Sequence, residues 1–286
     1  MRDGHGRDGR GRFRVALACA ATAVALTACG SHGPGDSFSA LPGTVSAVPT
    51  RPSASAYDKA RAAAPSDPGP EWKRVTKEDF DSFRDDAWGT YDSVGAFGNG
   101  LRRSSAVTVT DGLLNITASG GNVSGGIAHE LDQTYGRWEF RARTDKGRGF
   151  GSAILLWPQS ERFPEDGEID IMEVPSETRD RAHFIVHFPG PTGSDKVYGS
   201  YAEGDFSQWH TFAVDWLPDR IVYYMDGVEQ FRVKDRNIIP DKPMHLAIQF
   251  DQGPKKDWIL APDATTPASF ALQVDWVRVY APTSKS

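Results

Sequence analysis

Short runs of alternating apolar and polar residues, separated by turn signals, make up most of the chain between Trp72 and Tyr280. Two Asp-Gly pairs, at 111–112 and 226–227, each lie between two such runs, and this dipeptide is a strong local signal for a β-hairpin. No stretch keeps a helical period over three turns. The pattern predicts an antiparallel sandwich of two β-sheets. The expected strands cover residues 106–110, 113–118, 138–144, 152–157, 168–174, 182–188, 209–217, 223–225, 228–231, 244–250 and 270–280.

The stretch from Glu168 to Glu173 places three carboxyl groups within six residues. Strict alternation predicts a strand in which Glu168 and Asp170 share one face. Glu173 would point to the opposite face of a regular strand, so we expect a β-bulge at Ile171-Met172 to bring it back. Like charges on one strand face repel one another, whereas glycoside hydrolysis needs two carboxyl groups of unlike protonation state. The alternative interpretation is a solvated edge-strand face.

The sequence Glu-Ile-Asp-Ile-Met-Glu resembles the bulged Glu-x-Asp-x-x-Glu signature of family 16 glycoside hydrolases, the laminarinase and lichenase relatives. Residues 135–143, 210–221, 226–227 and 274–280 resemble further segments of this family, and the resemblance spans about residues 75–281. It implies an all-β fold, an antiparallel β-jelly-roll sandwich of the concanavalin A-like type, with a concave substrate cleft.

The match to the family motif also implies roles for the three acids. Glu168 would be the nucleophile, Glu173 the general acid and base, and Asp170 the residue that helps to set their protonation states. The implied enzyme is a retaining, endo-acting glycoside hydrolase that cleaves β-1,3 or mixed β-1,3/1,4-glucan by double displacement. A galactan hydrolase or transglycosylase of the same family, a non-catalytic lectin-like carbohydrate-binding protein and a cell-surface structural protein remain alternatives.

Trp157 ends a nearly all-apolar run that begins at Ser152. Its indole would either stack on a sugar ring of the substrate or pack in the core. Laminarinase-like members usually read Trp-Pro-Ala-Phe-Trp in this strand, whereas Gly151 and Leu155 occupy the two tryptophan positions here. We therefore expect the sugar-stacking arrangement to differ from that of the family.

Further substrate-binding residues follow from the resemblance. His187 matches a family position near the scissile sugar, and His183 lies on the same face of the expected strand; a structural role is the alternative for each. Arg141 and Gln249 fall in strands that the resemblance places across the cleft floor, although Arg141 could equally pair with a surface acid. Trp258 would contribute to a cleft wall.

The sequence has no His-x-x-x-His on a helix and no cysteine cluster, so we expect no metal or other cofactor in catalysis. Asp275, together with Asp79, resembles the structural calcium position of many family members, and carboxylate oxygens suit that ion. The alternative is a surface aspartate at each position.

Residues 1–28 have the features of an export signal, with a basic start and a short apolar run that ends in small residues. The sequence Leu-Thr-Ala-Cys at 26–29 resembles a bacterial lipobox, in which Cys29 would be lipidated; plain secretion after cleavage near Ala28 is the alternative. We therefore expect an exported protein, either secreted or anchored by lipid at the outer face of the bacterial cell membrane.

The composition then divides the rest of the chain. Residues 29–70 are rich in Gly, Ser, Pro and Ala and are expected to form a disordered tether. Residues 71–282 form the predicted catalytic domain, and 283–286 a tail. Removing residues 1–28 takes away five of 32 basic and two of 38 acidic residues, which leaves a net charge of −9. Such a chain is a poor nucleic-acid binder. The family resemblance implies a polysaccharide as the partner, and we expect a monomer.

Overall fold

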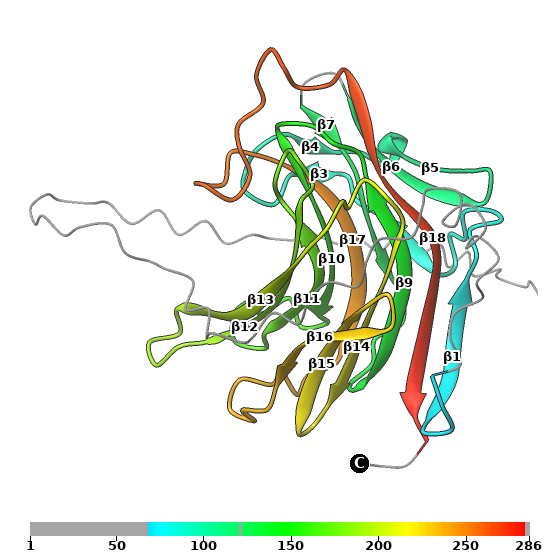
Figure 1. Ribbon diagram of the computed structural model, residues 1–286, viewed down its shortest axis with the longest axis vertical. Helices are drawn as coiled ribbons and strands as arrows, with labels where there is room; N and C mark the ends of the chain where they lie inside the picture. Colours follow the sequence, from blue (N-terminus) through cyan, green and yellow to red (C-terminus); the bar gives the residue numbers. More distant parts are fainter. Residues whose placement is uncertain (1–67, 120–121, 284–286) are drawn as a thin grey trace, which may run out of the picture.

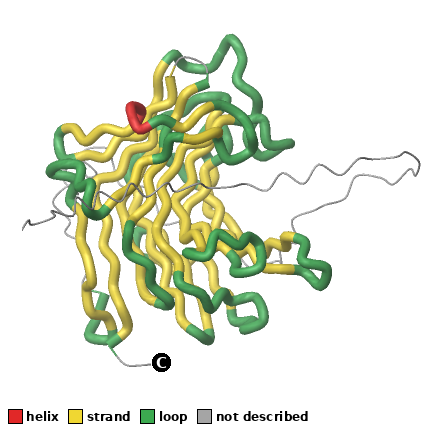
Figure 2. The backbone as a smooth tube through the Cα atoms, turned by 180° about the vertical axis from the view of Figure 1, so that it is seen from behind, coloured by secondary structure: helices red, strands yellow, loops and turns green. Residues whose placement is uncertain are grey.

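The computed structural model describes residues 68–119 and 122–283 of the chain. The expected signal peptide, Cys29 and nearly all of the expected tether lie outside these described residues. Apart from the 3₁₀ helix η2 (Ser104–Ala106), the regular structure of the described part consists of β-strands (Figure 2). No helix in this part is long and apolar enough to cross a membrane.

Two sheets pack against each other (Figure 1). The larger has eleven strands, nine of them in the order β16 (Val228–Val233), β15 (Arg220–Met225), β14 (His210–Leu217), β9 (Gly136–Thr144), β18 (Ser269–Pro282), β6 (Leu113–Ser119), β7 (Val123–Ser124), β4 (Leu101–Arg102) and β3 (Ser93–Val94). In addition, β1 (Trp72–Glu78) pairs with β18, and β5 (Val107–Thr110) pairs with β6.

The smaller sheet has seven strands. Their order is β13 (Asp195–Glu203), β12 (Arg181–Pro189), β11 (Glu168–Val174), β10 (Phe150–Pro158), β17 (Met244–Gln252), β8 (Gly126–His129) and β2 (Trp88–Thr90). Its strands are paired antiparallel throughout. Figure 1 shows both sheets bent in the same direction, with the seven-stranded sheet on the inner side of the bend. We call the face of this sheet that points away from the core the concave face.

Alternation along the strands decides which side chains enter the core. In β10, Ile154 and Leu156 are fully buried in the cluster between the sheets, whereas Leu155 belongs to a small apolar cluster with two alanines. Trp138 of β9 and Trp216 of β14 meet in the main core with ring centroids 5.8 Å apart. Apolar burial of this kind contributes about 25 cal/mol per Å², so a core shared by both sheets holds the sandwich together.

Both predicted Asp-Gly hairpins are confirmed. Asp111 and Gly112 have φ values of 54° and 72° between β5 and β6, and Asp226 and Gly227 have 50° and 77° between β15 and β16. Positive φ at both central residues is typical of a type I′ turn, whose twist matches that of the flanking strands. Aspartate and glycine tolerate this conformation, which explains why the dipeptide predicts the turn.

The predicted strands correspond to β5, β6, β9 to β12 and β14 to β18, with ends that differ by a few residues. The sequence did not predict β1, β8 or the long strand β13, which forms one edge of the seven-stranded sheet. The predicted all-β sandwich is confirmed.

Candidate active site

A β-bulge in β11 brings the three acids to the concave face. Against β10, Met172 pairs with Ile154, while Asp170 pairs with the next residue, Leu155, so that Ile171 is the extra residue. The pairing of β11 with β12 is interrupted at the same place, between Asp170 and Glu173. Ile171 and Met172 are both buried in the core. The predicted bulge is therefore confirmed.

The strand register assigns each acid a neighbour on β12. Glu168 lies opposite His187, and Glu173 lies opposite His183. Residues that face each other in an antiparallel pair point to the same side of the sheet. The concave face therefore carries two acid–histidine pairs, with Asp170 between them; its side chain is only 1% exposed.

The imidazole of His187 is held between two carboxylates. Its Nε2 lies 3.2 Å from Oδ2 of Asp170, and its Nδ1 lies 3.0 Å from Oδ1 and 3.1 Å from Oδ2 of Asp195. Phe163 packs against the ring at a centroid distance of 5.4 Å. Burial lowers the pKa of His187, but its contacts with Asp170 and Asp195 and the charge of Glu168 outweigh this and raise it to about 12. His187 is therefore an imidazolium ion at neutral pH.

The surroundings of Glu168 and Glu173 favour protonated carboxyl groups. Burial, followed by repulsion from Asp170, raises the pKa of Glu168 well above its usual range, and the positive charge of His187 opposes this shift. The same two causes raise the pKa of Glu173 to about 8. Because the groups interact, their titration belongs to the pair. The site can therefore hold one proton near neutral pH.

The two histidines differ in charge, and this difference separates the two acids. Burial lowers the pKa of His183 to about 4, so the residue opposite Glu173 is neutral, whereas the residue opposite Glu168 is charged. An adjacent cation stabilises a carboxylate and a neutral ring does not. The charge of His187 lowers the pKa of both acids, while burial and Asp170 raise it for both. It is the position of His187 directly opposite Glu168 on which we assign the carboxylate form to Glu168 and the retained proton to Glu173. This difference supplies the unlike protonation states that the sequence analysis required.

Trp157 lies on the concave face and not in the main core between the sheets. It packs against the apolar cluster of Ala153, Leu155 and Ala247. Its Nε1 donates a hydrogen bond to Oε2 of Glu161 at 2.9 Å. Its ring also stacks on that of Phe163, with centroids 5.5 Å apart and planes 16° apart. The β10–β11 loop therefore contacts one face of the indole, and stacking on a sugar stays a prediction.

Gln249 and Trp258 lie near the three acids, as predicted. Gln249 of β17 pairs with Ala153, and Ala153 in turn pairs with Glu173, so the three residues share one row across the sheet. The ring of Trp258 contacts that of His183 at a centroid distance of 4.4 Å. Their roles in binding substrate stay predictions.

The placement of Arg141 on the cleft floor is wrong. Arg141 belongs to β9 of the eleven-stranded sheet, and its Nη1 lies 2.5 Å from Oδ2 of Asp275 on β18. It also packs over the ring of Trp209. Strand parity correctly separates Arg141 from its core-facing neighbours, but it does not reveal which sheet the strand joins. The alternative, that Arg141 pairs with an acidic side chain, is the arrangement found in the structure.

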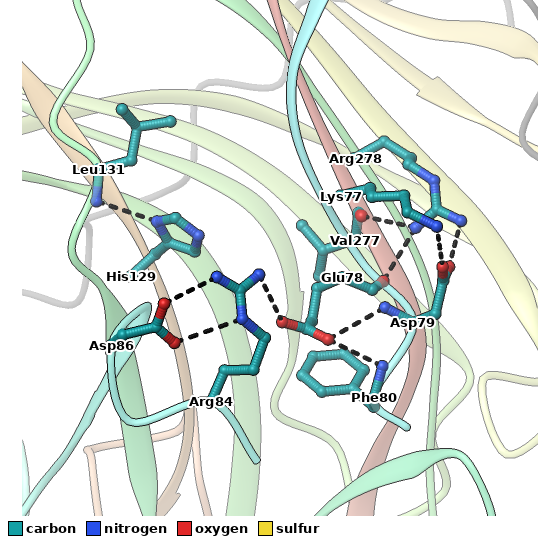
Figure 3. A network of polar contacts seen from close by, with 10 residues as sticks. All are labelled: Lys77, Glu78, Asp79, Phe80, Arg84, Asp86, His129, Leu131, Val277 and Arg278. Atoms are coloured by element: carbon teal, nitrogen blue, oxygen red, sulfur yellow. Dashed lines mark hydrogen bonds and ion pairs between the residues drawn. The ribbon is translucent and has the colours of Figure 1, made fainter. Parts of the chain in front are cut away.

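The two aspartates proposed for calcium are both paired with arginine. Asp275 binds Arg141, and Asp79 accepts hydrogen bonds from Arg278 and from Lys77, the latter at 2.9 Å (Figure 3). Both carboxylates therefore already contact cationic side chains. This donor set gives no support to structural calcium, which stays an untested prediction.

Within residues 68–119 and 122–283, the His, Asp and Glu side chains close enough to share a metal ion are Glu168, Asp170 and His187. Their ligand atoms lie within 4.8 Å of one another. Both ring nitrogens of His187 already contact carboxylates, Nε2 that of Asp170 and Nδ1 that of Asp195. The group is better explained as an acid–base cluster.

Sequence reasoning missed Asp195 and Phe163, which hold the His187 ring. The β-branched and aromatic side chains of Val197, Tyr198 and Tyr201 could have revealed β13, and with it the position of Asp195. Phe163 lies in the β10–β11 loop, where no periodic pattern predicts the direction of a side chain.

The chain is similar to known proteins. The family model described as glycosyl hydrolases family 16 matches residues 99–278. The chain is 31% identical over 170 residues to a beta-glucanase of Rhodothermus marinus, with 51% of this chain and 57% of the relative covered. It is 29% identical over 171 residues to glucan endo-1,3-beta-glucosidase A1 of Niallia circulans, with 53% of this chain and 25% of the relative covered. It thus spans less than two thirds of either curated relative.

Among solved structures, the chain resembles the catalytic domain of an endo-1,3-beta-glucanase (laminarinase) from Thermotoga petrophila. The TM-score is 0.65 at 23% sequence identity, with 74% of this chain and 99% of that chain covered. This likeness confirms the predicted jelly-roll fold. The chain belongs to glycosyl hydrolases family 16.

The raised pKa of Glu173 predicts a pH-dependent stability. Below the usual value of 4.5 the carboxyl group is protonated in both folded and unfolded chains. Between pH 4.5 and about 8 the carboxyl group of Glu173 ionises only in the unfolded chain, so the folded state loses stability as the pH rises. Above about pH 8 the group is ionised in both states and the loss of stability is complete. Glu173→Gln should therefore melt close to the parent at pH 4 and roughly 3–6 °C higher at pH 9.

Differential scanning calorimetry at the two pH values measures this effect. Glu130→Gln, at an exposed position, is the control and should shift the melting temperature by less than about 2 °C at either pH. A Glu173→Gln variant that is no more stable than the parent at pH 9 would contradict the proposed burial of a protonated acid.

Proposed function

We propose that this protein is a retaining, endo-acting glycoside hydrolase that cleaves a β-glucan. The observation that carries the proposal is the bulged strand β11, which places Glu168, Asp170 and Glu173 on one face. A binding protein has no need for three clustered acids that repel one another. Membership of glycosyl hydrolases family 16, and relatives that are named as glucanases, support the same chemistry.

The proposed reaction has two steps. The Glu168 carboxylate attacks the anomeric carbon, while Glu173 gives its proton to the glycosidic oxygen as the bond between that oxygen and the anomeric carbon breaks. In the second step Glu173 takes a proton from water, the resulting hydroxide attacks the same carbon, and Glu168 leaves as a carboxylate. Two inversions at one carbon retain its configuration. The charged His187 opposes the rise in the pKa of Glu168 and so favours its carboxylate form between the steps.

The concave face provides a surface suited to β-1,3 or mixed β-1,3/1,4-glucan. The partly exposed Trp157 packs on the buried cluster of Ala153, Leu155 and Ala247, and its apolar ring suits the C–H faces of uncharged sugars. At Gly151, where laminarinase-like members carry a tryptophan, a Cβ would lie 2.7 Å from Cδ1 of Ile259. The 253–260 loop therefore fills the space of that side chain, in agreement with the altered arrangement that the sequence predicts.

Release of reducing ends from laminarin, lichenan, agarose and xyloglucan tests the proposal. We expect turnover of laminarin or lichenan by the parent, and a loss of roughly 1,000-fold or more in Glu168→Gln, because the amide keeps the shape but cannot attack carbon. Glu130→Gln should remain fully active.

The other outcomes separate the alternatives. Cleavage of agarose or xyloglucan without cleavage of the two glucans would contradict the proposed polymer and leave the chemistry intact. Binding of glucans by the parent with no release of reducing ends, and no effect of Glu168→Gln, would instead indicate a lectin-like protein.

We also propose that the exported protein is a monomer anchored by lipid at Cys29. The lipobox-like sequence at 26–29 and the Gly-, Ser- and Pro-rich stretch after it support this. Stable anchoring requires more than one acyl chain, as a bacterial lipoprotein carries. Cys29→Ala should move the protein from the membrane fraction to the medium, as immunoblots of the two fractions would show. A parent protein found wholly in the medium would contradict the proposal.

A further inference from the structure

A row of side chains leads from Glu173 to the edge of the seven-stranded sheet. Glu173 of β11 lies opposite His183 of β12, which lies opposite Tyr201 of β13. All three point to the concave face, because directly paired residues share a face. Neighbouring strands are about 4.8 Å apart, so Tyr201 lies about 10 Å from Glu173 along the row. Since β13 is the edge strand, the row opens to solvent there (Figure 1).

Tyr201 is an exposed aromatic residue with a defined orientation. It is 45% exposed, although tyrosine carries a large apolar ring. The guanidinium of Arg181 lies over this ring, 5.0 Å from its centroid, and the ring of His183 lies 5.7 Å away. These contacts fix the ring without covering it. The next residue of β13 on the same face is Gly199, where a Cβ would lie 2.6 Å from the carbonyl oxygen of Phe184. No side chain therefore projects from β13 at the position beside Tyr201.

Trp258 reaches the same row from a distant part of the sequence. It lies in a tight turn in which the N–H groups of Lys255 and Trp258 bond to the carbonyls of Ile259 and Lys255, at 2.9 and 2.8 Å. This turn follows β17, which is separated from β12 by the two strands β10 and β11. The Trp258 ring nevertheless contacts the ring of His183 edge-on, with ring centroids 4.4 Å apart and ring planes at 61° to each other. The loop therefore extends over the sheet to the row.

The chemistry of this cluster suits an uncharged sugar. Aromatic rings pack against the C–H faces of pyranoses, and a polar group beside them can bind hydroxyls. His183 is neutral at physiological pH, because burial lowers its pKa to about 4, and a neutral imidazole has one donor and one acceptor nitrogen. The row continues directly from the acid that would protonate the leaving oxygen, so a bound polymer would pass over it.

We propose that Tyr201, His183 and Trp258 form a sugar-binding subsite. It would hold the part of the glucan chain that extends from the scissile bond across β12 and β13. The inference rests on the proposed glucanase function. It adds that Tyr201 is a specificity-determining residue and that the enzyme prefers chains long enough to reach the sheet edge.

Steady-state kinetics of Tyr201→Ala on laminarin or lichenan test the subsite. Removal of an aromatic contact worth about 0.5–1.5 kcal/mol corresponds to a loss of affinity of roughly 2- to 10-fold. We expect KM for the polymer to rise by this factor with kcat nearly unchanged, because the sugar is bound equally in ground and transition states. Tyr201→Phe should keep most of the affinity. On a series of oligosaccharides, the effect of Tyr201→Ala should disappear below the length that reaches Tyr201.

Val228→Ala is the matched control, since Val228 is 48% exposed on an edge strand of the other sheet. It should leave KM unchanged at every chain length. If the parent cleaves glucan and Tyr201→Ala leaves KM unchanged, or changes it equally for all chain lengths, the subsite is contradicted while the proposed function stands. If the parent cleaves no glucan, the proposed function itself fails. Circular dichroism of the variants shows that they are folded.

Discussion

The extra residue in β11 is the constraint on which the site depends. In a regular strand Glu173 would point into the core, where an acid would lie among Ile169, Ile171 and the aromatic side chains of the opposite sheet. The bulge sends both Ile171 and Met172 into the core and returns Glu173 to the concave face. The core of the sandwich and the acid cluster are therefore two sides of one strand, and a change in register would destroy both together.

The charges around Glu168 and Glu173 give different roles to two chemically identical carboxyl groups. A doubly held imidazolium at His187 faces Glu168, and a neutral imidazole at His183 faces Glu173. Burial gives each acid a raised pKa, which a surface acid would not have. The fold supports this arrangement through Asp195 on the edge strand and Phe163 in a loop, so parts remote from the motif control its protonation.

The features of the fold and of the site that depend on local chemistry could be predicted from the sequence. The Asp-Gly turns, the bulge and the shared face of the acids follow from φ preferences and side-chain parity. Arg141 was misplaced because parity does not identify the sheet that a strand joins. Asp195, Phe163 and Tyr201 were missed because their contacts cross between strands or come from a loop, and tertiary packing sets them. The predicted calcium residues form ion pairs, which short sequence segments do not reveal.

The central claim is that one bulged strand holds a nucleophile and an acid on the same face for a double displacement. Proton NMR of the first product released from a β-glucan tests this most directly, because the anomeric signals of the new reducing end appear before mutarotation mixes them. The account predicts that the β-anomer appears first, since two inversions restore the configuration. A product that appears first as the α-anomer would show a single displacement and would contradict the role of Glu168 as a nucleophile.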